Sequence, residues 1–100
     1  MKKRFSDSDV KKIVESAMVY QCACPAQVAE LLLELRRVEA YESGCLEKAN
    51  DHLSKTHIAI RDAVAEVHER MERCLDEVLD IEGWDRNTME MPEHLRSQHD

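Results

Sequence analysis

Cysteine and histidine side chains carry most of the chemistry that this chain of 100 residues could perform. Cys22 and Cys24 belong to a Cys-x-Cys-Pro motif that interrupts a helical stretch. If the chain folds back on itself as a helical hairpin, His68 and Cys74 come level with this motif. Thiolates and imidazoles are ligands that zinc prefers, so Cys22, Cys24, His68 and Cys74 form a candidate metal site with zinc as the expected metal. A redox-active thiol centre at the same motif is the alternative chemistry.

Simple burial explains the same cysteines without any chemistry. A reduced cysteine behaves as a small apolar core residue, and Cys74 occupies a core position in a helical seam. His68 and Cys74 are six residues apart, which places them about 120° apart around a helix. One Cys-x-Cys is also a weaker metal signature than two Cys-x-x-Cys pairs. Metal binding, thiol redox chemistry and burial therefore stay open as interpretations.

No motif in the sequence supports an enzyme. The chain has no Gly-rich phosphate loop, no Cys-x-x-Cys-His haem motif and no histidine with a glutamate three residues before it. The last pattern is the one that di-iron helical bundles use. Charged residues such as Arg36 and Glu72 are expected on the solvated faces of helices. We therefore expect no catalysis.

Charge and hydropathy narrow the choice of partners and of compartment. The formal net charge is −7, which disfavours nucleic acid because binding it depends on neutralising phosphates with Lys and Arg. The only basic run, Lys2, Lys3 and Arg4, is expected to be a solvated terminus. No stretch is apolar enough for a membrane span or a signal-peptide core. The sequence therefore predicts a cytoplasmic protein, with neither nucleic acid nor membrane as a partner.

Apolar residues recur at alternating spacings of four and three in the second half of the chain. This heptad pattern predicts one long helix that packs along another helix. His57 falls inside the pattern, at a position where a polar residue usually fixes register and oligomeric state. The full seam consists of Leu53, His57, Ile60, Val64, Val67, Met71, Cys74, Val78 and Ile81.

The remaining signals divide the chain into three helices and a tail. The predicted helices cover residues 8–21, 25–42 and 46–82, with a break near residues 22–25 where Pro25 opens the second helix. Gly44 is predicted to end the second helix, and Gly83 the third. Residues 1–84 then form one helical domain, and residues 85–100 are expected to be a flexible polar tail.

The predicted lengths favour an antiparallel hairpin. The first two helices together match the third in length, so the first arm is expected to lie along the third helix and to be broken near residues 22–25. Such a thin hairpin buries little apolar surface by itself, so two copies are expected to pair as a four-helix bundle. The sequence thus predicts a small adaptor or interaction protein that acts through homodimerisation and through binding of a protein partner. A metal- or redox-responsive protein is the alternative.

Overall fold

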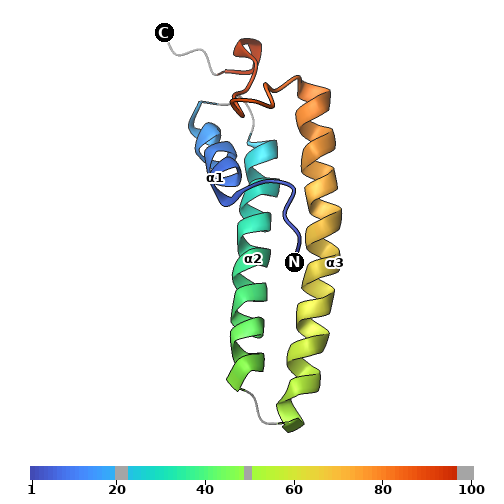
Figure 1. Cartoon of the computed structure of the whole chain (residues 1–100). Helices are drawn as coiled ribbons and strands as arrows, with labels where there is room; N and C mark the ends of the chain where they lie inside the picture. The colour runs from blue at the N-terminus through green and yellow to red at the C-terminus, as the bar shows by residue number, and fades with distance from the viewer. Residues whose placement is uncertain (20–22, 49–50, 97–100) are drawn as a thin grey trace.

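All regular structure in the described part of the chain is helical, apart from isolated bridge residues such as the pair Asp85 and Glu90. The structure is a computed structural model that describes residues 1–19, 23–48 and 51–96. The main helices are α1 (Asp7–Glu15), α2 (Cys24–Lys48) and α3 (Asp51–Glu82). Two short 3-10 helices, η1 (Ser16–Met18) and η2 (Glu93–Leu95), complete the order. The molecule is a long rod of 59 × 23 × 19 Å (Figure 1). The predicted all-α class is confirmed.

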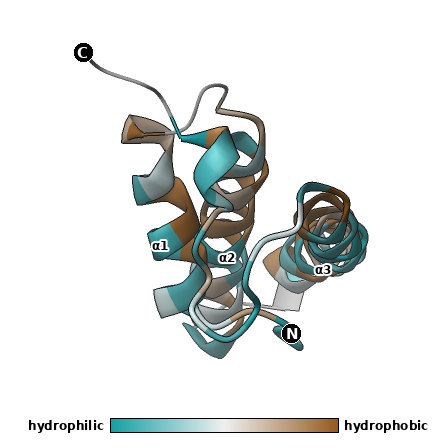
Figure 2. Cartoon of the chain, turned by 90° about the horizontal axis from the view of Figure 1, so that it is seen from above, coloured by the Kyte–Doolittle hydropathy of each residue, from teal (hydrophilic) through white to brown (hydrophobic). Residues whose placement is uncertain are grey.

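Helix α1 folds back beside α2. Ser6 caps its start by accepting a hydrogen bond from the Asp9 N–H at 3.0 Å, and Val10 and Ile13 form its buried stripe. Viewed from above, α1 and α3 lie on opposite sides of α2 (Figure 2). This corrects the expected broken arm, because α1 packs against α2 and does not extend it along α3. The α1 stripe finds its apolar partner on α2, which the length comparison could not reveal.

Helices α2 and α3 form the antiparallel hairpin. Pro25 lies in the first turn of α2, where its missing N–H leaves no intrahelical bond unmade. The predicted end of this helix differs, because Gly44 lies inside α2 and the helix continues to Lys48. A glycine inside a helix costs only about 1 kcal/mol relative to alanine, which one further turn of packing readily offsets.

The end of α3 matches the predicted glycine stop. Gly83 has φ +80°, and the Trp84 N–H donates to the Leu79 carbonyl at 3.0 Å while the Gly83 N–H donates to the Asp80 carbonyl at 3.2 Å. These two bonds define a Schellman ending. The turn directs the Trp84 side chain into the core.

The segment after α3, which the sequence predicted as a flexible polar tail with Met89 and Met91 as its candidate contacts, packs on the helices. The Asp85 carboxylate accepts hydrogen bonds from the Asn87 and Thr88 N–H groups, and Met89 is buried at φ +57°. Residues 97–100 of the expected tail lie outside the described residues. The buried core consists of Phe5, Val10, Ile13, Ala29, Leu32, Leu75, Leu79, Trp84 and Met89.

The buried face of α3 is rotated away from the predicted seam. His68, Glu72, Leu75 and Leu79 are buried, each one residue after a seam position. Among the seam positions themselves, Val67 is 46% exposed and Ile81 is 75% exposed. The buried face of α3 is rotated in this way because α1 and residues 1–5 cover only one side of the hairpin. Among the described helices, none is long and apolar enough to cross a membrane.

Candidate functional site

One side of the α2–α3 hairpin, here called the open face, is lined by apolar and thiol side chains that repeat every seven residues. The row on α2 and the row on α3 share this face, because Cys45 and Leu53 line the same surface hollow. Leu31 is 40% exposed, Leu53 46% and Ile60 39%. The open face consists of Cys24, Leu31, Val38 and Cys45 on α2, and Leu53, Ile60, Val67, Cys74 and Ile81 on α3.

The two rows are in register with each other. His57 and Glu42 fix the level at which the helices face one another, because His57 Nδ1 lies 2.6 Å from Glu42 Oε2. Cys45 follows Glu42 by three residues and Leu53 precedes His57 by four, so these two row members lie at nearly the same height, and seven-residue steps from them in opposite directions along the antiparallel helices pair the other row members. Cys45 then pairs with Leu53, Val38 with Ile60, Leu31 with Val67, and Cys24 with Cys74. The open face is therefore a series of two-residue layers along the rod.

The elongated chain has more solvent-accessible surface than a compact monomer of the same size would have. The radius of gyration is 16.4 Å, against about 13 Å for a compact domain of this length. The accessible surface is 6857 Å², against about 5,800 Å² expected for a monomer of this mass. The excess of about 1,000 Å² is close to the area that one partner contributes to a standard protein interface.

The open face has a hollow near the hairpin turn, where another chain could approach the backbone closely. Its volume is about 460 Å³, and Gly44, Ala40 and Tyr41 lie along its wall. A Cβ atom built on Gly44 would meet nothing within 4 Å. The glycine therefore leaves the α2 backbone accessible at a place where alanine would give a more stable helix.

The opposite side of the hairpin encloses a buried ion cluster centred on Arg36, which is 7% exposed. Its guanidinium donates to His68 Nε2 at 3.0 Å, to Glu72 Oε2 at 3.1 Å and to Asp7 Oδ1 at 2.7 Å. The Arg36 guanidinium also holds the pKa of the Asp7 carboxyl below its usual value, with a smaller contribution from Lys3. Arg36 thus links α2 to α3 and to the start of α1.

His68 is the fully buried member of this cluster. Because Nε2 accepts a hydrogen bond from Arg36, the neutral ring carries its proton on Nδ1. That atom has no hydrogen-bond partner among the described residues, and Glu72 Oε1 lies 3.6 Å away. Burial lowers the pKa of His68 from its ordinary value, against the opposing charge of Glu72.

We therefore expect stability to fall in mild acid. The unfolded chain takes up a proton on His68 near its ordinary pKa of about 6.5, whereas the folded chain resists this proton because its pKa is lowered. Below that pH the free energy of unfolding falls by up to about 1.4 kcal/mol per pH unit from this group. Urea unfolding at pH 7.5 and pH 5.5 measures the loss. His68→Gln should lose less between the two pH values, and an equal loss would contradict the assignment to His68.

The described residues of the predicted metal site differ in their exposure to solvent and in their hydrogen bonding. Cys24 is exposed, Cys74 is half-buried, and His68 is buried with Nε2 bonded to Arg36. Cys22 lies outside the described residues. Within the described part of the chain, no three His, Cys, Asp or Glu side chains are grouped to hold a metal ion. Zinc binding that includes Cys22 stays a prediction.

His57 has a specific partner, which is Glu42 on α2. Glu42 is 7% exposed, so this polar pair occupies a layer of the hairpin seam. Its role in fixing register and oligomeric state stays a prediction.

Sequence reasoning missed the ion cluster, because it expected Arg36 and Glu72 on solvated faces. Both are buried, which corrects that expectation. A signal was present in the spacing: Arg36 follows Leu32 by one turn, and Glu72 precedes Leu75 by three residues. Both charges therefore lie on the apolar stripes of their own helices.

No protein-family model, curated protein or solved structure matches this chain.

Proposed function

We propose that this protein is a helical interaction module that works as a homodimer, with the open face as its working surface. Two hairpins would pack open face to open face and form a four-helix bundle. The observation that carries the proposal is the pair of heptad rows on α2 and α3, where Val38 is half-buried and the other apolar members, Leu31, Leu53, Ile60, Val67 and Ile81, are 39% to 75% exposed. Isolated exposed apolar residues are ordinary, but a continuous periodic face is typical of an interaction surface.

A second copy is the partner that this face fits best. Heptad rows on both helices at matching heights can be related by a two-fold axis, so that each layer meets a layer of the same kind. The excess surface of about 1,000 Å² matches one side of a standard interface. Gly44 and Ala40 would let the backbones of the two copies come close together near the hairpin turn.

The chain offers a matched pair of isoleucines to test this face. Ile60 belongs to the open face and is 39% exposed, while Ile58 lies two residues earlier and is 40% exposed. Because two residues turn a helix by about 200°, the two side chains project in nearly opposite directions. A charge at Ile60 would be buried without a partner in the dimer, whereas a charge at Ile58 would stay in water.

We expect Ile60→Glu to weaken dimerisation at least about a hundredfold, since an unpaired buried charge costs several kcal/mol. Ile58→Glu should leave the dimerisation constant within about threefold of the natural chain. Sedimentation equilibrium over a range of concentrations measures both constants. Equal constants for the two variants would show that the open face is not the interface.

A further inference from the structure

Residues 1–5, here called the N-terminal arm, lie against α2 and α3 on the side of the hairpin that carries the ion cluster (Figure 1). Glu72 Oε2 accepts hydrogen bonds from the Arg4 N–H at 2.7 Å and from the Phe5 N–H at 3.1 Å. Arg36 Nη2 donates to the Phe5 carbonyl at 2.8 Å. These three bonds all use main-chain atoms of the arm. They would accept any segment whose backbone N–H and C=O groups are placed in the same way.

Phe5 supplies the apolar anchor of the arm. It is 3% exposed and belongs to the core cluster. The Arg86 guanidinium lies 5.7 Å from the centroid of its ring, within the range of a cation–π contact. Arg86 is itself held by ion pairs to Asp76 and Asp80. The pocket therefore selects an aromatic side chain at this one position.

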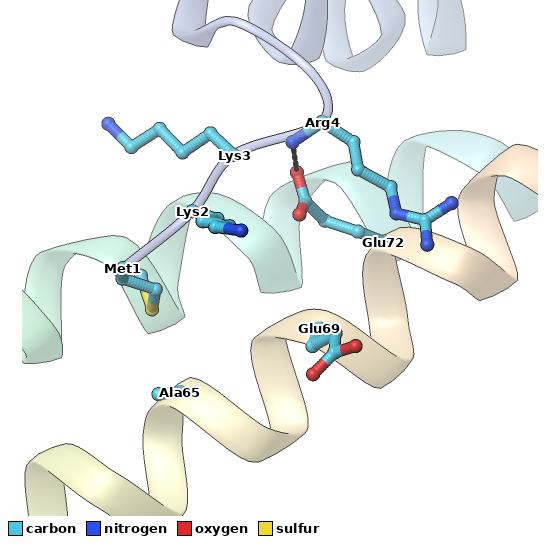
Figure 3. A pocket seen from close by; sticks show the side chains of 7 residues that line it. All are labelled: Met1, Lys2, Lys3, Arg4, Ala65, Glu69 and Glu72. Carbon is cyan, nitrogen blue, oxygen red and sulfur yellow. Dashed lines mark hydrogen bonds between the residues drawn. The ribbon is translucent and has the colours of Figure 1, made fainter.

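The residues before the anchor are basic, and the surface beside them carries acidic groups. Glu69 and Glu72 lie on adjoining turns of α3 that face residues 1–4 (Figure 3). A hollow of about 580 Å³ runs between residues 1–4 and α3. The arm leaves this space unfilled, so the groove has room for more side-chain atoms than the arm provides.

We propose that this groove is a peptide-binding site and that the arm is its intramolecular occupant. Its partner is a protein segment with two or more basic residues followed directly by phenylalanine. Such a segment would displace the arm, place its aromatic ring in the Phe5 pocket and bond its backbone to Glu72 and Arg36. The carboxylates of α3 would attract its basic residues. This site is independent of the open face.

The test uses the full-length chain carrying Phe5→Ala, which empties the anchor pocket. The probe is a fluorescent peptide with the sequence Met-Lys-Lys-Arg-Phe-Ser, and its matched control has alanine in place of phenylalanine. We expect the Phe5→Ala protein to bind the probe at least about tenfold more tightly than the natural chain, in which the arm competes. The control peptide should bind about tenfold more weakly than the probe. Equal binding of the two peptides, or no binding to a folded Phe5→Ala protein, would overturn the proposal.

Hydrogen exchange on the natural chain gives a second test that needs no variant. The Arg4 and Phe5 amides should exchange through local release of the arm, faster than the amides of Leu75 and Leu79 and with little dependence on denaturant. Excess probe peptide should speed their exchange further. Exchange of these amides only by global unfolding would overturn the proposal. Loss of the dimer in the Phe5→Ala protein would also overturn the proposal, because it would show that each groove holds the arm of a second copy and not its own.

Discussion

Replacing Arg36 with alanine is expected to lower the free energy of unfolding by about 3–5 kcal/mol. The substitution leaves Glu72 as a buried carboxylate without its cation and leaves His68 Nε2 without its donor. Removing one partner of a buried charge pair is far more damaging than the net worth of the pair, because the remaining charge has lost water and gained nothing.

Arg37 is a matched control one residue away on the same helix. It is exposed and pairs with Glu34 across a single turn. Surface pairs of this kind contribute a few tenths of a kcal/mol, so Arg37→Ala should change stability by less than about 0.5 kcal/mol. Urea unfolding followed by circular dichroism, at one fixed protein concentration, measures both variants. Similar losses for Arg36→Ala and Arg37→Ala would contradict the burial of the cluster.

Replacing Leu75 with alanine is expected to cost about 2–5 kcal/mol, because its side chain is fully buried in the core and the cavity left behind cannot close completely. Cys74→Ala is the neighbouring control. The heptad pattern places Cys74 in the core, but the structure leaves it half-buried. We expect the Cys74 variant to lose less than half of what the Leu75 variant loses. Thermal and urea unfolding of the two proteins provide the comparison, and the reverse ranking would restore the seam as the core of α3.

The local signals in this chain predicted three helices and the outer ends of the hairpin, although not the end of α1 or the end of α2. Pro25 opens α2, and Gly83 ends α3 with the predicted hydrogen bonds. Local capping and propensity determine these features, so they can be derived from short stretches of sequence. The place of α1 depends on which face of α2 offers its apolar partners. That choice is made by tertiary packing, and the lengths of the helices do not encode it.

The heptad pattern identified a real periodic face but wrongly placed that face in the core of the hairpin. Ile60 and Val67 repeat as predicted, yet they are exposed because the core of the hairpin lies on the side that α1 and the arm cover. Periodicity shows that a face needs a partner, and it does not say whether that partner is in the same chain. The ion cluster was missed because charged residues are seldom buried unless several groups from distant segments meet. Arg36 meets His68 and Phe5 only after the chain has folded.

The molar mass of the protein in solution tests the proposed dimer most directly. Multi-angle light scattering on the natural chain at micromolar concentration should give about twice the 11.6 kDa of one chain. The Ile58→Glu protein should give the same doubled mass, and the Ile60→Glu protein should give the mass of one chain. A mass of 11.6 kDa for the natural chain at this concentration would contradict the proposal that the open face joins two copies.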